Sequence, residues 1–218
     1  MKFGVMGTGK VGTTIATKLE LLGHEVKIGS RSAGGETAIA CAETSRARAG
    51  AGTFAEAAAF GEVVFNCTAG AACLDALRMA GAENLDGKVL IDVANPLDRS
   101  GMPPALTVSN TDSLGEQIQR TFPNTKVVKT LNTVNHEVMV APGIVPGQHS
   151  IFVSGNDSDA KSQVMDLLGS FGWSRDQVID LGDITTSRGP EMYLALWLRL
   201  LIAGNYDSHF NIGVIKAK

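Results

Sequence analysis

The chain has 218 residues, of which 44% are hydrophobic and 19% charged, the composition of an ordinary globular protein large enough to bury a sizeable core. Its formal net charge of −3 argues against nucleic acid or an anionic membrane surface as a partner. The sequence predicts neither a secretory leader nor a membrane span, because its longest apolar stretch, residues 192–203, is short and contains Arg199; we therefore expect a cytoplasmic protein.

Residues 2–30 have the pattern of a strand, a helix and a second strand. Residues 2–6 form an apolar run typical of a buried parallel strand, residues 13–22 gather apolar side chains on one helical face, and residues 24–30 again have strand character. Gly23 lies where the helix should end. This is the β-α-β arrangement in which dinucleotide-binding motifs occur.

The alternation of strands and helices continues along the chain. We expect helices at residues 36–49, 70–80 and 113–121, and strands at residues 63–65, 89–93 and 126–130. Such alternation predicts an α/β fold, a Rossmann doubly wound parallel sheet with helices on both faces. The loop 95–106, with three prolines, is expected to form an exposed rim of the active site.

A change in the pattern of the sequence near residue 147 predicts a second, smaller unit. We expect strands at residues 149–154 and 177–181, a helix at residues 159–171 and a long apolar last helix at residues 191–203. The sequence therefore predicts a Rossmann domain over residues 1–147 and a small C-terminal α/β domain over residues 148–218.

The turn after the first strand reads Gly7-Thr8-Gly9-Lys10-Val11-Gly12, a G-x-G-x-x-G motif in the context that makes it specific. Gly7 permits the tight turn, Gly9 lets the backbone approach a pyrophosphate, and Gly12 lets the helix pack close to the strand. The helix N-terminus then offers N–H groups and a partial positive charge to the anion. A merely flexible glycine turn is the alternative, and we favour a dinucleotide site.

The end of the second strand, Gly29-Ser30-Arg31-Ser32, predicts the kind of dinucleotide. NAD sites usually carry Asp or Glu here to accept hydrogen bonds from the ribose 2′-OH. Arg31 can instead bind a 2′-phosphate in a bidentate manner, and Ser30 and Ser32 can donate to it. We therefore expect NADP(H), although an ordinary solvated arginine in a loop would look the same.

Small and amide side chains end the later strands, at the sheet edge where the nicotinamide should lie. These strand ends read Cys67-Thr68-Ala69-Gly70, Asn95-Pro96-Leu97 and Leu131-Asn132-Thr133. Asn95 and Asn132 are candidates to bind the carboxamide or a substrate, and Thr133 is a further substrate candidate. Asn and Gly are equally common in turns that follow strands, so turn chemistry remains an equal alternative.

Two further residues are weaker candidates for contact with a substrate. His136 lies at an expected helix start, where a purely structural role is favoured. Arg188 and Glu191 precede the last apolar helix and would either reach a ligand or form an i,i+3 surface pair. No catalytic residue can be assigned. The three cysteines lack the spacing of metal ligands, so we expect free buried thiols in a reducing compartment and no metal site.

Several of these segments together resemble the F420-dependent NADP oxidoreductase family. They are the Gly7–Gly12 turn, residues 23–26, 29–31, 92–97 and 127–133, and Ser187-Arg188 before the apolar helix. The resemblance implies a Rossmann domain with a small C-terminal domain, and NADP(H) bound by Thr8, Ser30 and Arg31. It also implies hydride transfer to a second redox ring, which requires two rings face to face and no dedicated acid or base. The NADPH-binding domains of membrane ferric reductases belong to the same wider group.

Departures from the family pattern leave the acceptor open. Residues 33–36 lack a lysine found in archaeal members, and Asn132 stands where those members have histidine. The first hypothesis is that the acceptor is F420 or a flavin-like ring. One alternative is an NADPH-dependent reductase of a small carbonyl or imine, for which the sequence predicts neither a long helical C-terminal domain nor a suitably placed lysine. Another is a non-enzymatic NADP sensor that binds a protein partner.

The last helix carries an apolar stripe that is wide for a small domain. Its members are Tyr193, Leu194, Leu196, Trp197, Leu200 and Leu201. We expect this stripe both to pack on the sheet and to form the interface of a homodimer.

Overall fold

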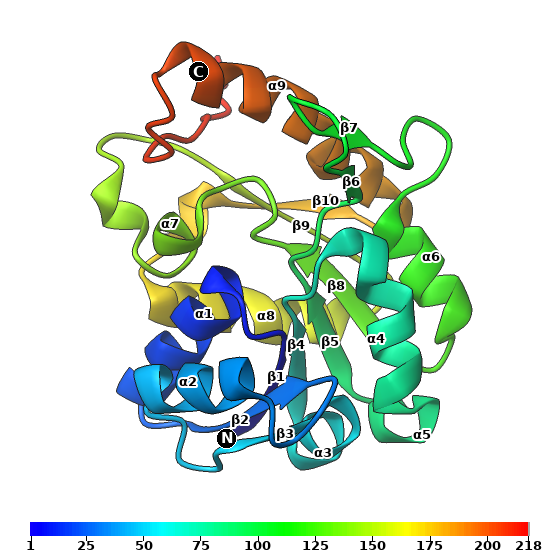
Figure 1. The fold of residues 1–218 in the computed structure, drawn as a ribbon. Helices are drawn as coiled ribbons and strands as arrows, with labels where there is room; N and C mark the ends of the chain where they lie inside the picture. The colour runs from blue at the N-terminus through cyan, green and yellow to red at the C-terminus, as the bar shows by residue number, and fades with distance from the viewer. Residues whose placement is uncertain (218) are drawn as a thin grey trace.

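One eight-stranded sheet with helices on both faces forms the centre of the molecule (Figure 1). The computed structural model describes residues 1–217. The strands lie in the order β10-β9-β8-β5-β4-β1-β2-β3. Their bounds are β1 Lys2–Met6, β2 Glu25–Ser30, β3 Ala51–Thr53, β4 Val63–Asn66, β5 Val89–Asp92, β8 Lys126–Thr130, β9 Ile151–Gly155 and β10 Val178–Gly182. The expected Rossmann doubly wound fold is confirmed.

The sheet is parallel except at one junction. β9 pairs antiparallel with β8, whereas β10 returns parallel to β9. Strands from both sides of residue 147 thus belong to the same sheet. The division into two domains at that residue stays a prediction.

Helices cover the sheet in the order expected for repeated β-α units. Their bounds are α1 Lys10–Leu21, α2 Glu36–Ser45, α3 Phe54–Phe60, α4 Cys73–Ala80, α5 Ala82–Leu85, α6 Leu114–Thr121, α7 His136–Val140, α8 Ser158–Phe171 and α9 Arg188–Ala203. Two apolar clusters, one including Ile15 and Leu19 of α1 and the other Leu77 of α4, make up the core. Within residues 1–217, no helix is both long enough and apolar enough to cross a membrane.

The segment 36–60 differs from the expectation of one helix over 36–49. α2 ends at Ser45 because Arg46 takes a left-handed conformation with φ +55° and caps the helix. β3 and α3, which follow, were not predicted. Thr53 begins α3 with a capping box, in which its hydroxyl accepts from the Glu56 N–H and the Glu56 carboxylate accepts from the Thr53 N–H.

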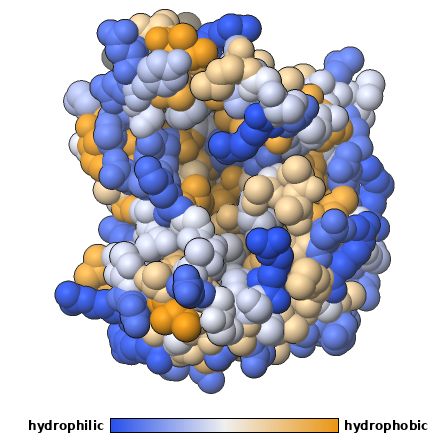
Figure 2. Space-filling model, in the orientation of Figure 1, coloured by the Kyte–Doolittle hydropathy of each residue, from blue (hydrophilic) through white to orange (hydrophobic). Residues whose placement is uncertain are grey.

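The proline-containing loop 95–106 holds a short hairpin of its own. β6, Leu97–Asp98, pairs antiparallel with β7, Ala105–Leu106. In Figure 1 the hairpin lies between the carboxyl edge of the sheet and α9. The space-filling view shows this face hollowed at its middle, with apolar and neutral side chains inside the hollow (Figure 2).

Candidate functional site

The glycines of the first turn differ in what surrounds them. A Cβ on Gly7, whose φ is +116°, would lie 2.6 Å from the Cys67 carbonyl oxygen, and a Cβ on Gly12 would lie 2.1 Å from the Gly7 carbonyl oxygen. Both positions therefore require glycine for the close contact of α1 with β1 and β4. Around Gly9, by contrast, no described atom lies within 4 Å of the Cβ position. The turn is tightly packed inside and open outside at Gly9.

The N-terminus of α1 faces that opening. Gly9 is the N-cap of α1 and, having no side chain, makes no side-chain capping bond to the first N–H groups. These N–H groups and the helix dipole are therefore available to an anion. The geometry is the one that close approach of a pyrophosphate to the backbone needs.

The loop after β2 presents an unengaged cation. The Ser30 hydroxyl donates to the Ser32 carbonyl oxygen at 2.6 Å and accepts from the Ser32 N–H at 3.3 Å, so it shapes the loop rather than pointing freely outward. Arg31 is exposed between them, and within the described chain its guanidinium forms no ion pair or hydrogen bond. It remains available for a phosphate, which favours the interpretation of this strand end as a 2′-phosphate site.

A pocket of about 440 Å³ joins the first turn to the carboxyl ends of two further strands. Its lining includes these residues from the predicted cofactor set: Val11, Cys67, Thr68, Ala69 and Asn95. Parallel strands bring their carboxyl ends to one edge, and the sheet order β5-β4-β1-β2 places these residues beside the turn where the winding reverses. Pro96 lies outside this pocket, in the lining of a neighbouring one.

The turn after β4 is held in place by a buried amide. Asn66 Oδ1 accepts from the Thr68 hydroxyl at 2.7 Å and from the Thr68 N–H at 3.3 Å. Its Nδ2 donates to Asp92 Oδ1 at 2.7 Å and contacts the Cys73 sulfur at 3.0 Å. The side chain of Asn66, at the end of β4, therefore fixes the orientation of Thr68. Burial raises the pKa of the Cys67 and Cys73 thiols, so neither is a thiolate nucleophile at neutral pH.

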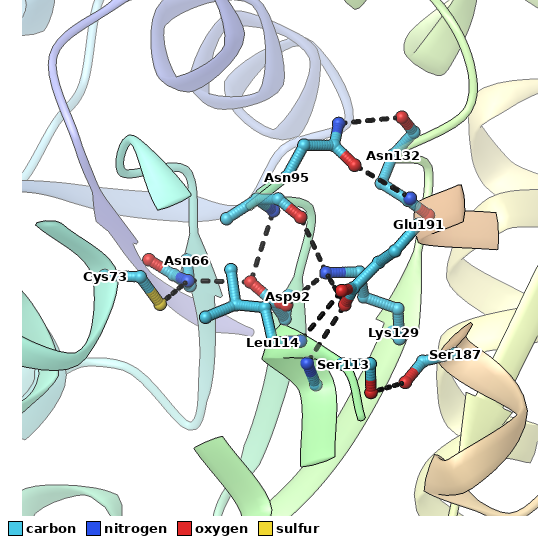
Figure 3. Close-up of polar contacts among 12 residues, drawn as sticks. Asn66, Cys73, Asp92, Asn95, Ser113, Leu114, Lys129, Asn132, Ser187 and Glu191 are labelled. Atoms are coloured by element: carbon cyan, nitrogen blue, oxygen red, sulfur yellow. Dashed lines mark hydrogen bonds and ion pairs between the residues drawn. The ribbon is translucent and has the colours of Figure 1, made fainter. Parts of the chain in front are cut away.

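A charged triad of Lys129, Asp92 and Glu191 lies where β5 and β8 end and α9 begins (Figure 3). Lys129 Nζ is 2.7 Å from Asp92 Oδ2 and 2.8 Å from Glu191 Oε1, and all three side chains are at most 1% exposed. Lys129 also donates to the Ala94 carbonyl oxygen at 2.6 Å. Burial of Lys129 acts to lower its pKa, but the charges and hydrogen bonds of the two carboxylates outweigh this effect and raise the pKa, which keeps Lys129 charged.

Glu191 joins three parts of the fold. It accepts from the N–H groups of Leu114 at 2.7 Å and Gly115 at 3.0 Å, the first residues of α6. A carboxylate at a helix N-terminus satisfies N–H groups that have no intrahelical partner. α9, which carries Glu191, is therefore fixed to α6 and, through Lys129, to β8.

Asn95 and Asn132 bind each other. Asn95 Nδ2 donates to the Asn132 carbonyl oxygen at 2.9 Å, and Asn132 Nδ2 donates to Asn95 Oδ1 at 3.0 Å and to the Pro190 carbonyl oxygen at 3.1 Å. The preceding Leu131 is buried with φ +63°, an unusual conformation for a leucine that turns the chain at the end of β8. The pair closes the space between the ends of β5 and β8.

The remaining substrate candidates lie in different surroundings. Thr133 is 1% exposed and, within residues 1–217, its hydroxyl has no hydrogen-bond partner. His136 Nδ1 lies 2.9 Å from the Thr14 hydroxyl of α1, and burial lowers the pKa of His136, which favours the neutral ring. Arg188 forms a bidentate pair with Glu116 at 2.8 and 2.6 Å and is thereby turned away from the pocket.

The i,i+3 pair considered for Arg188 and Glu191 is wrong, because Glu191 is buried against Lys129. Sequence reasoning also missed the triad as a whole. A signal existed: Asp92 and Lys129 are charged residues inside otherwise apolar strands, where a buried charge requires a partner. In the part of the chain that the structure describes, no three His, Cys, Asp or Glu side chains are grouped as metal ligands.

Comparison with known proteins gives close and distant relatives. The family model for NADP oxidoreductase coenzyme F420-dependent matches residues 2–96. A crystal structure from Arthrobacter sp. FB24, of a protein provisionally named an F420-dependent NADP-reductase, is 51% identical with a TM-score of 0.92, and the match covers 99% of this chain and 100% of that one.

Two other relatives match a part of a longer chain. Metalloreductase STEAP3 of Rattus norvegicus is 28% identical over 92% of this chain, which spans only 37% of the length of that protein. An imine reductase of Streptomyces aurantiacus has a TM-score of 0.67 at 18% identity, covering 94% of this chain and 64% of the other, a likeness of fold alone. Because the 51% identity extends over the whole length of its relative, the chain belongs to the F420-dependent NADP oxidoreductase family, a family of NADP-dependent oxidoreductases.

Proposed function

We propose that the protein passes a hydride between the nicotinamide of NADP(H) and a second redox ring, F420 or a flavin-like molecule. The observation that carries this proposal is the pocket of about 440 Å³ where the Gly7–Gly12 turn meets the ends of β4 and β5. Small side chains such as Ala69 and Ala94 line it, as the approach of a flat ring requires. Its charged lining residues are Asp98 and Arg99.

The chain's own residues would bind and orient the two reactants. The N–H groups at the start of α1 would bind the pyrophosphate, and Arg31 would bind the 2′-phosphate. When bound, NADPH supplies the hydride. Rate acceleration then comes from holding the donor and acceptor at short distance and in line, for which no proton-transferring residue is needed.

The strand ends supply polar groups for the nicotinamide side. Asn95 and Asn132 are hydrogen-bonded to each other, so the orientations of their side-chain amides are fixed. The hydroxyl of Thr133 has no hydrogen-bond partner within residues 1–217, but Thr133 is buried and does not line this pocket. Its contact with the carboxamide or the acceptor ring stays a prediction.

The test is an acceptor panel with the purified full chain. NADPH oxidation is followed at the nicotinamide absorbance band with F420, FMN, FAD, ferric chelates and small carbonyls. Oxidation with F420 or a flavin supports the proposal, whereas oxidation with carbonyls alone supports the carbonyl reductase. Tight NADPH binding without turnover of any acceptor would contradict the proposal and favour a sensor.

We also propose that the protein is a homodimer through α9. Leu194 of this helix is 5% exposed, whereas Met192, Leu196, Leu200 and Ile202 are 38%, 54%, 38% and 37% exposed. The helix therefore buries one side against its own chain and leaves these apolar side chains, with the exposed Arg199 among them, in water. A second copy covering that side would remove this apolar surface from solvent.

A further inference from the structure

Among the described residues, Arg99 is the one cationic residue in the lining of the proposed nicotinamide pocket. It belongs to the segment between β6 and β7 and lines the same pocket as Val11 and Thr68. Apart from Asp98, the other lining residues are uncharged. Within residues 1–217, the Arg99 guanidinium forms no ion pair and no hydrogen bond, so its five donors are available to a ligand.

The neighbouring carboxylate does not neutralise Arg99. Asp98 accepts from the Ser100 N–H at 2.8 Å and from the Ser100 hydroxyl at 2.8 Å, one bond on each oxygen. These bonds hold the pKa of Asp98 below its usual value and keep it ionised. Within residues 1–217, Asp98 forms no ion pair with Arg99, so the guanidinium remains available to an anion from outside.

The position of Arg99 separates it from the phosphate-binding loop of β2. Arg31 follows β2, and Arg99 follows β5 and β6, with β4 and β1 between β5 and β2 in the sheet. Neighbouring strands are about 4.8 Å apart, so three spacings place β5 roughly 14 Å from β2. Arg31 is also not among the residues that line the pocket of Arg99, so we assign the two arginines to different anions.

We propose that Arg99 binds an anionic group of the electron acceptor, a phosphate or carboxylate carried beside the redox ring, and thereby determines acceptor specificity. This assignment rests on the proposed function, because it places the acceptor in the same pocket as the nicotinamide. A guanidinium matches either anion with two parallel hydrogen bonds, which an ammonium cannot do. Acceptors with an anionic side chain should therefore be preferred over neutral acceptors with the same ring.

FMN and riboflavin are the matched probes, because they share one ring and differ in a phosphate. Affinities for both are measured by quenching of flavin fluorescence on the complex of the full chain with NADP⁺, and kcat/KM is measured with NADPH as donor. Arg99→Gln should lower the FMN-to-riboflavin ratio by about tenfold to a hundredfold, the size of a hydrogen bond to a charged group. Arg99→Lys should lower it less, since the charge remains.

Arg175→Gln is the matched control, since Arg175 is also an exposed arginine but lines a different pocket, beside α8 and β10. It should leave the ratio unchanged. An unchanged ratio in Arg99→Gln, or equal or undetectable binding of the two flavins to the unmutated protein, would overturn the proposal. A parallel loss of NADPH affinity would overturn it too, because Arg99 would then bind the cofactor.

The two proposals fail in different ways. Turnover of flavins with an unchanged FMN-to-riboflavin ratio in Arg99→Gln rejects the role of Arg99 and leaves the reductase intact. A binding ratio that falls in Arg99→Gln, without turnover of any acceptor, supports the anion site and rejects the proposed reaction.

Discussion

Replacing Lys129 by methionine tests the energetics of the buried triad. Methionine keeps much of the length of lysine but removes the charge, which leaves Asp92 and Glu191 as two buried carboxylates without their cation. Each retains other hydrogen bonds, Asp92 from Asn66 and Glu191 from the start of α6, so the losses at the two carboxylates should not simply add. Breaking a buried pair from one side typically costs about 3–5 kcal/mol, and we expect a loss in that range.

The loss is measured as the free energy of unfolding in urea. Fluorescence of Trp173 and Trp197 reports the transition from two places in the fold. Lys161→Met is the control, because Lys161 pairs with a carboxylate of Asp180 that is 39% exposed, and such pairs contribute about 0–1 kcal/mol. The triple variant Asp92→Asn, Lys129→Met, Glu191→Gln removes every charge and should recover much of the loss.

The pH dependence gives the sign of the effect. Burial opposes the charge of Lys129, but the two carboxylates outweigh this effect and raise the pKa of Lys129 above its ordinary value of 10.5. A group with a raised folded pKa contributes stability that is present below its unfolded pKa and is lost as pH rises above it, so the deficit of Lys129→Met should be full at neutral pH and shrink above pH 10.5. A deficit that matches the Lys161→Met control, or that does not shrink above pH 10.5, would refute the reasoning.

Three further predictions concern the surface of the protein. Arg31→Ala should weaken NADPH binding by about tenfold to a hundredfold and leave NADH binding unchanged, as measured by titration; equal affinity of the unmutated protein for both would reject the NADP preference. Arg120 lowers the pKa of Asp112 from 3.8 to about 2. Arg120→Gln should therefore destabilise the protein in thermal unfolding above pH 3.8, and this deficit should vanish as pH falls toward 2. A deficit that persists at the lowest pH would contradict this prediction. Leu196→Glu places a charge on the exposed side of α9 and should convert a dimer to monomers in light scattering, whereas Leu21→Glu, at a 77% exposed position on α1, should not; a monomeric unmutated protein would reject the interface.

Local patterns predicted the parts of the fold that depend on local sequence. The strand at 126–130 was placed without error, and the first β-α-β unit was recognised because apolar spacing and the glycines of the turn are both read within a few residues. The segment 51–60 was missed although Thr53 and Glu56 form a capping box that is visible in the sequence. The expected helix over 36–49 runs past the end of α2 at Ser45, and no element was expected between residue 49 and the strand at 63–65, because the Ala-rich sequence there has no sharp periodicity.

Contacts between distant segments could not be predicted in the same way. Asn95 and Asn132 were both singled out, but their mutual hydrogen bonds join residues 37 positions apart, and only the sheet order brings them together. Lys129 and Glu191 meet because α9 returns across the carboxyl edge of the sheet. A single sequence does not indicate that α9 packs across this edge of the sheet, so the triad of Asp92, Lys129 and Glu191 could be identified only from the structure.

The antiparallel pairing of β9 with β8 has a consequence for any attempt to divide the protein. A fragment that ends at residue 147 would leave the outer edge of β8 without its hydrogen-bonded neighbour. The same cut would remove Glu191, and with it one of the two counterions of Lys129 and the cap on the first turn of α6. Cofactor affinity is therefore expected to be a property of the whole chain, and the first 147 residues should not behave as a separable nucleotide-binding module.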